Sequence, residues 1–171
     1  MFNLFKKRNE NDKFINQVVG GQSVIFSIFK EAFEEDDTAV NKAELTYFAL
    51  SVFTYTFLRL SKMADDRKEV IADEVALEVL QKSVPYANKR LSVKEAAHEY
   101  QNRYQEYNTL INAMFKDEKI DSNACTTLMM HLYECVMGKS AEKKMIQISV
   151  ASPLLAQYVV DHVDFLKQFD K

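Results

Sequence analysis

An almost uncharged stretch covers residues 45–60, where Arg59 is the single charged side chain. The stretch is apolar on every side of a helix, and its polar side chains are small hydroxyls and two tyrosines. Small hydroxyls can bond to a carbonyl of their own helix inside apolar surroundings. A helix of this kind is a core helix or a membrane span, and a span needs about 20 apolar residues. The stretch is shorter, so we predict a helix over residues 40–64 at the centre of a bundle.

Hydrophobic residues elsewhere recur mostly at the three- and four-residue spacing of amphipathic helices. This pattern predicts helices over residues 12–35, 67–84, 92–115 and 122–137, and a last helix that begins near residue 153. The chain has only three glycines and two prolines, whereas sheets with tight hairpins need more of them. We therefore expect an all-α fold, a compact bundle of six to seven helices around a central apolar helix.

Residues 145–150 are ambiguous, because hydrophobic and polar side chains alternate there as in a strand. No partner strand is evident, so a helix from about residue 141 is favoured. Ser152 followed by Pro153 is typical of the first residues of a helix, and we expect a break or kink at that point.

Two adjacent glycines, Gly20 and Gly21, lie inside the first predicted helix. They cost about 2 kcal/mol relative to two alanines, so a compensating role is expected. Close packing against a neighbouring helix is the favoured interpretation, and a hinge or an opening for a ligand is the alternative.

The length of 171 residues suits a single domain. A chain of this size buries roughly 70% of the surface that its unfolded form exposes, so it needs no disulfide or metal to hold its fold. We expect residues 11–171 to form the domain and residues 1–10 to be an N-terminal tail. Residues 1–8 combine apolar and basic side chains, which predicts at most a weak contact with a membrane surface.

The formal net charge is −3, so the chain has no basic excess for holding a polyanion. This charge argues against a nucleic-acid partner. Cys125 and Cys135 lie ten residues apart on one predicted helix, about 15 Å along its axis, which is too far for a disulfide. Two unpaired thiols suit a reducing compartment, so we expect a cytoplasmic protein.

One face of the helix predicted over residues 92–115 is unusually rich in tyrosine. Its hydrophobic positions alternate in steps of four and three, and Tyr100, Tyr104 and Tyr107 occupy three consecutive positions. Tyrosine is enriched at protein interfaces, and its hydroxyl needs water or a partner. We predict a contact surface for another chain made by these tyrosines and Arg103. The alternative is that the rings form the outer edge of the core, with their hydroxyls at its rim.

The core is rich in flexible and aromatic side chains, with seven methionines and twelve phenylalanines. Methionine fills irregular gaps and can also line an adaptable pocket. Phe48, Phe53 and Met129 are the candidates for an apolar ligand cavity, and ordinary core packing is the alternative.

Two pairs of residues have the spacing of metal ligands. Glu95 and His98 share a helix face, as in di-iron bundles, but only one copy of this pair exists. His131 and Cys135 are one helical turn apart and could touch one metal ion or form a thiol–imidazole pair. Cys135 continues an inward-facing stripe, so we expect a buried, inert thiol there. No catalytic residue, metal or other cofactor is expected.

The sequence therefore predicts a non-enzymatic cytoplasmic module that acts by binding another protein, as adaptors, immunity proteins, inhibitors and chaperones do. A second copy of the chain is the simplest partner. Two alternatives stay open, a bundle that binds a small apolar ligand and a metal-dependent enzyme that uses Glu95 and His98.

Overall fold

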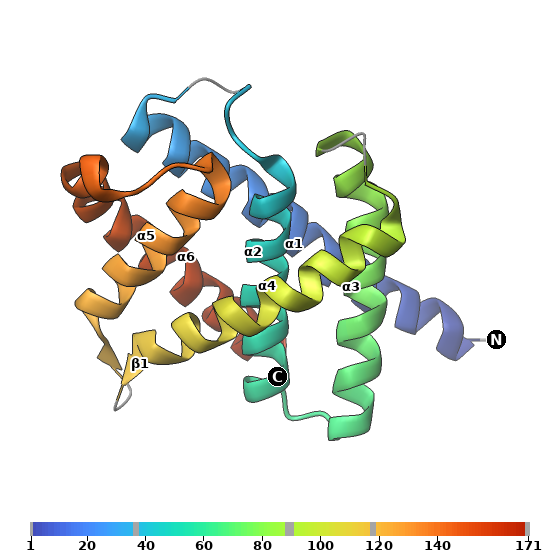
Figure 1. The fold of residues 1–171 in the computed structure, drawn as a ribbon. Helices are drawn as coiled ribbons and strands as arrows, with labels where there is room; N and C mark the ends of the chain where they lie inside the picture. Colours follow the sequence, from blue (N-terminus) through green and yellow to red (C-terminus); the bar gives the residue numbers. More distant parts are fainter. Residues whose placement is uncertain (1, 36–37, 88–90, 117–118, 170–171) are drawn as a thin grey trace.

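The computed structural model describes residues 2–35, 38–87, 91–116 and 119–169. The predicted all-α fold is confirmed, and over these residues the chain forms six α-helices (Figure 1). A short 3-10 helix, η1 (Glu142–Lys144), precedes the last of them, and two two-residue strands, β1 (Phe115–Lys116) and β2 (Lys119–Ile120), pair in antiparallel fashion. The helices are α1 (Phe2–Phe33), α2 (Lys42–Leu60), α3 (Asp65–Ala87), α4 (Val93–Met114), α5 (Ser122–Met137) and α6 (Met145–Phe169).

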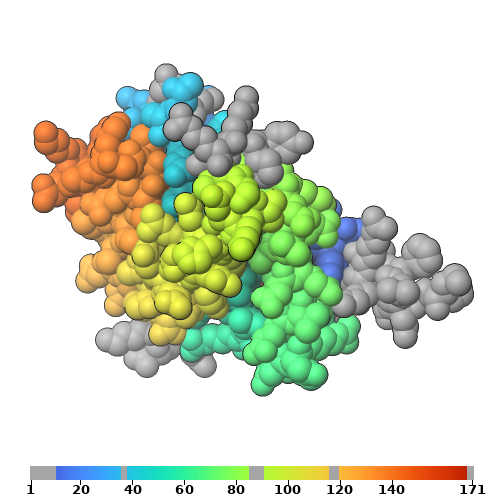
Figure 2. Space-filling model, turned by 45° about the vertical axis from the view of Figure 1, so that its right-hand side comes forward, coloured from blue at the N-terminus to red at the C-terminus, as the bar shows by residue number. Residues whose placement is uncertain are grey.

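Helix α2 lies at the centre of the bundle, as its all-round apolar pattern predicts. Every residue from Ala43 to Phe57 is buried. Figure 1 shows α4 crossing in front of α2 and α1 passing behind it. In the view of Figure 2, α3, α4 and α5 together cover this face and leave only small parts of α2 visible. Over the described residues, no helix combines the length and apolarity that crossing a membrane requires.

Three of the four small hydroxyls of α2, those of Thr46, Ser51 and Thr56, are satisfied inside the helix itself. Ser51 Oγ donates to the carbonyl oxygen of Tyr47 at 2.8 Å, and Thr56 Oγ1 donates to that of Val52 at 2.6 Å. These bonds allow polar side chains to be buried without water. The prediction that such hydroxyls bond back to their own helix is confirmed for these three residues.

Local sequence signals define several helix ends. The Asn41 side chain caps α2, and Ser92 with Glu95 forms the predicted capping box at the start of α4. The Asp121 side chain caps α5. Gly138 ends α5 in the left-handed conformation, with φ of 61°, as glycine does most readily.

Helix α1 begins at Phe2, so the backbone of residues 2–10 continues the helix that the sequence predicted from residue 12. The predicted membrane-surface contact of residues 1–8 concerns side chains that lie outside the described part of the structure. Within α1, a Cβ atom at Gly21 would collide with the hydroxyl of Tyr158 on α6, whereas at Gly20 it would meet open space. Close packing against a neighbouring helix therefore accounts for Gly21 and not for Gly20.

Both prolines lie within helices, and the structure corrects two predicted helix ends. Helix α3 runs past Pro85 to Ala87, and α6 is one helix from Met145 that includes Pro153. The expected break at Ser152 and Pro153 is therefore wrong, and residues 145–150 are helical. A proline inside a helix costs about 3 kcal/mol. Buried side chains on both sides of Pro153 offset that cost by packing in the core, among them Ile148, Ala151 and Leu155.

His162 on α6 is a buried polar side chain in an aromatic environment. Its ring centroid lies 6.0 Å from that of Phe53 and 6.2 Å from that of Phe165. Neither ring nitrogen has a hydrogen-bond partner among the described residues. Burial lowers the pKa of His162 to about 4, because the charged imidazolium would lose its hydration.

This burial makes the stability of the fold depend on pH. The pKa of His162 falls from 6.5 in the unfolded chain to about 4 in the folded protein, so the unfolded chain takes up the proton first. The contribution of the neutral His162 ring to the free energy of unfolding is fully present above about pH 6.5. This contribution is lost as the pH falls towards 4. Between pH 7 and pH 5, we expect the wild type to lose about 2 kcal/mol more free energy of unfolding than His162→Phe does. Urea unfolding at the two pH values measures this difference. An unchanged pH dependence in the variant would contradict this assignment.

Phe53 tests the central position of α2. Its side chain is fully buried and stacks on Phe57 with ring centroids 5.2 Å apart. Phe53→Asp places an unpaired charge in the core, at a cost of several kcal/mol. We expect circular dichroism to show an unfolded chain or a strongly lowered Tm. A folded variant with the Tm of the wild type would refute the core position.

Candidate functional site

A buried carboxylate, Glu44, joins α2 to α4. Its side chain is only 4% exposed. It accepts a hydrogen bond from the hydroxyl of Tyr107 at 2.8 Å, and Arg103 Nε lies 3.1 Å from one of its oxygens and 3.2 Å from the other. Burial raises the pKa of Glu44, an effect that the bonds from Tyr107 and Arg103 oppose. This contact therefore keeps a buried charge inside the bundle by pairing it.

Three further side chains continue this network towards α5, and we call them the α4–α5 cluster: Glu106, His131 and Cys135. Arg103 donates through Nη1 to Glu106 Oε2 at 2.9 Å. The same carboxylate oxygen lies 3.3 Å from His131 Nε2, and Cys135 Sγ lies 3.5 Å from that nitrogen. Over the described residues, these three form the one group of His, Cys, Asp and Glu side chains that could share a metal ion.

Cys135 is less buried than the sequence predicts. Its side chain is half-buried, whereas Cys125 on the same helix is buried. The inward stripe of α5 does include Leu132 and Val136, but Cys135 sits at its edge, beside His131. Partial burial raises the pKa of Cys135, and so does the nearby Glu44 carboxylate.

The predicted contact tyrosines mostly face inward. Tyr107 is buried with its hydroxyl on Glu44, and Tyr100 is buried with its hydroxyl 2.9 Å from Thr54 Oγ1. Arg103 pairs with Glu44, so it too serves the interior. Tyr100 and Tyr107 therefore lie at the core, as in the alternative interpretation, while Arg103 stays partly exposed. The half-buried Tyr104 lines a hollow of about 460 Å³ between α3 and α4.

The predicted ligand-cavity residues are packed in the core. Phe48, Phe53 and Met129 are all fully buried. Phe48 meets the ring of Tyr107 edge-on at 5.1 Å. The three residues line neither the hollow between α3 and α4 nor the groove described below. Their positions fit ordinary core packing.

Glu95 and His98 both lie on the exposed side of α4. Glu95 accepts a hydrogen bond from the Ser92 backbone N–H at 2.7 Å, and its bonds with Ser92 lower the pKa of Glu95. The carboxylate is therefore used to cap the helix. No third candidate ligand among the described residues converges on this pair.

The first half of α6 carries an exposed apolar face. Ile146, Val150 and Leu154 follow one another at four-residue spacing, and their exposed fractions are 81%, 61% and 47%. No charged residue occurs from 145 to 160. We call these three side chains the α6 stripe.

Opposite charges lie at the two ends of the α6 stripe. Lys143, in η1 directly before α6, is exposed, and so is Asp161 beyond the apolar part. Lys143 lies two residues before the first residue of α6, and Asp161 lies seven residues, about two α-helical turns, after Leu154 on nearly the same side of α6. Gln157 donates to Asp161 Oδ1 at 2.7 Å and helps to orient this carboxylate.

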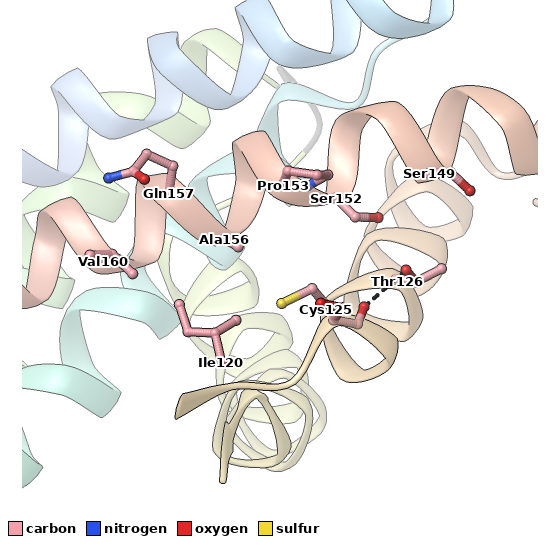
Figure 3. A pocket seen from close by; sticks show the side chains of 10 residues that line it. Ile120, Cys125, Thr126, Ser149, Ser152, Pro153, Ala156, Gln157 and Val160 are labelled. Carbon is pink, nitrogen blue, oxygen red and sulfur yellow. Dashed lines mark hydrogen bonds between the residues drawn. The ribbon is translucent and has the colours of Figure 1, made fainter. Parts of the chain in front are cut away.

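A groove of about 350 Å³ runs beside the α6 stripe, between α5 and α6 (Figure 3). In Figure 3 the sulfur of Cys125 points into the space between the two helices. Pro153 has no N–H, so the carbonyl of Ser149 in the groove wall lacks the donor that position i+4 normally supplies. The groove is lined by Ile120, Ser122, Cys125, Thr126, Ser149, Ser152, Pro153, Ala156, Gln157 and Val160.

The α6 stripe is not evident from the sequence, because residues 145–150 alternate between hydrophobic and polar side chains as in a strand. The signal that could have revealed it is the absence of charge from 145 to 160, in a chain where 27% of residues are charged. No family model, curated protein or solved structure matches the chain.

Arg103 provides a test of the buried ion pair. Arg103→Ala leaves the Glu44 carboxylate buried with Tyr107 as its remaining partner, and we expect a loss of about 2 kcal/mol in urea unfolding. Adding Glu44→Gln removes the unpaired charge, so the double variant should regain part of the loss. Lys94→Ala, an exposed change on the same helix, should shift stability by less than about 0.5 kcal/mol. Equal stability of Arg103→Ala and Lys94→Ala would contradict the structural role of the pair.

Proposed function

We propose that this protein is a non-enzymatic helical module that acts by protein–protein binding, and that the α6 stripe is its contact surface. The observation that supports the proposal is the row of large apolar side chains held in solvent. Exposed apolar patches with a polar rim are typical of interaction sites. Ile146, with 81% of its surface exposed, contributes little to the fold that holds it.

The partner that this surface fits is a second copy of the chain. When two α6 helices pair antiparallel about a twofold axis, the apolar parts face each other. The same arrangement brings Lys143 of each copy towards Asp161 of the other. The small side chain of Ser149 and the ring of Pro153 beside the stripe permit close approach of the two helices.

A cytoplasmic location goes with this proposal. Cys125 and Cys135 are both free thiols, which suits a reducing compartment.

The apolar residues of the α6 stripe lie on a helix that already belongs to a folded bundle. The interface is therefore preformed, and binding does not require a disordered segment to become ordered.

Sedimentation equilibrium tests the proposal. We expect the wild type to form dimers and Val150→Asp to be monomeric, since a charge at the centre of an apolar interface lacks a partner. Val70→Asp is the matched control, an exposed valine on α3 outside the α6 stripe, and it should still form dimers. Circular dichroism should be unchanged in both variants because both side chains are exposed.

Charge exchange then tests the antiparallel arrangement. Lys143→Glu puts like charges together at both ends of the interface and should weaken the dimer. Lys143→Glu combined with Asp161→Lys restores opposite charges and should recover it. A wild type that stays monomeric would refute the second copy as partner, and dimers of Val150→Asp would refute the stripe as the interface.

A further inference from the structure

The α4–α5 cluster brings three different donor atoms to one point. Glu106 Oε2 comes from α4, while His131 Nε2 and Cys135 Sγ come from successive turns of α5. All three atoms lie within 4.8 Å of one another. The side chains are reachable from solvent, since His131 is 31% exposed and Glu106 is 45% exposed.

Two neighbours compete for one nitrogen of His131. Glu106 Oε2 at 3.3 Å and Cys135 Sγ at 3.5 Å both approach the same nitrogen of His131. A carboxylate needs Nε2 to carry a proton, whereas a thiol donates to an Nε2 that carries a lone pair. A single protonation state therefore satisfies only one of the two neighbours well.

The same geometry argues against a catalytic relay. In a nucleophile–histidine–carboxylate triad, the nucleophile and the carboxylate contact opposite nitrogens of the ring. In this protein both lie at Nε2 of His131. The oxygen, nitrogen and sulfur atoms are therefore arranged as ligands around one point, and not as a chain of groups that transfer a proton.

Two of the three distances between the ligand atoms match the edges of a zinc coordination sphere, and the third, between Glu106 and Cys135, is within 4.8 Å. Zinc binds nitrogen and oxygen at about 2.0–2.2 Å and sulfur at about 2.3 Å, usually in tetrahedral geometry. Those bond lengths give distances between neighbouring ligand atoms of about 3.3 to 3.6 Å. The oxygen–nitrogen distance of 3.3 Å and the sulfur–nitrogen distance of 3.5 Å fall in this range.

We propose that Glu106, His131 and Cys135 bind a zinc ion, with water as the fourth ligand. The Cys135 thiolate and the Glu106 carboxylate together balance the two positive charges of the ion. Arg103, which stands beside Glu106, has its own charge balanced by Glu44. Arg103 then orients the Glu106 carboxylate from outside the coordination sphere, as partners of metal ligands commonly do.

The spacing of His131 and Cys135 in the sequence provides two ligands of this site and no third. Glu106 lies 25 residues before His131, a separation that no short metal-binding motif covers. Ligand spacing within single helices predicts a metal-free protein. The packing of α4 against α5 supplies the missing carboxylate.

Cobalt titration of the metal-free protein tests the proposal. Cobalt(II) replaces zinc in such sites and shows a thiolate-to-metal absorption band in the near ultraviolet. We expect one equivalent to bind the wild type with this band, and added zinc to remove it. Cys135→Ser should abolish the band, and Glu106→Gln should weaken cobalt binding by more than about 100-fold, since changes outside the coordination sphere already cost 10- to 100-fold.

Two matched variants serve as controls. Cys125→Ser changes the other thiol of α5, and His98→Ala changes an exposed histidine of α4. Both should keep the band and the wild-type affinity. The absence of a band in the wild type, or its persistence in Cys135→Ser, would overturn the site.

Glu106→Gln is the variant least prone to misfold, because its side chain is exposed. If Cys135→Ser does not fold, unchanged cobalt affinity in Glu106→Gln overturns the site on its own. The Val150→Asp variant should bind cobalt normally, so failure of the zinc site and failure of the dimer interface can be distinguished.

Discussion

The rest of the bundle depends on one constraint, which is that α2 is buried on every side and its polar groups must find partners within the protein. The hydroxyls of Ser51 and Thr56 bond to α2 itself, but Thr54 and the longer polar side chains reach a neighbouring helix. Most of them reach α4, and together these bonds set the position of α4 along α2. The contacts are Glu44 with Tyr107 and Arg103, Tyr47 with Glu99, Thr54 with Tyr100, and Tyr55 with Asn112.

The same constraint explains the composition of α4. A helix that packed against α2 with leucine alone would leave the Glu44 carboxylate unpaired in the core, at a cost of several kcal/mol. Tyr107 fills core volume with its ring and also donates to Glu44 through its hydroxyl. Because Arg103 and Tyr107 are held in this way, Glu106 between them is directed towards α5. The α4–α5 cluster thus follows from how α2 is buried.

Features encoded within one turn or one helix were predictable from the sequence. All-round apolarity placed α2 at the centre, and the spacing of Ser92 and Glu95 identified the start of α4. Features that need two helices were not predictable. The tyrosines of α4 could have faced a partner or the core, because their spacing is the same in both cases. Pro153 stays inside α6 because of packing along its neighbours, which local propensity does not contain.

Helix α5 shows how one residue type acquires two different chemistries. Cys125 faces the groove beside α6, where the lining offers hydroxyls, an amide and hydrocarbon but no histidine or carboxylate. Cys135 lies on the side towards α4, where an imidazole and a carboxylate approach it within 4.8 Å. Burial raises the pKa of both thiols, and so do Asp121 at Cys125 and Glu44 at Cys135, so a thiolate needs a neighbouring cation to be stable at neutral pH. The proposed metal ion, shared with His131 and Glu106, would meet that need at Cys135, whereas the groove beside Cys125 offers no such ligands.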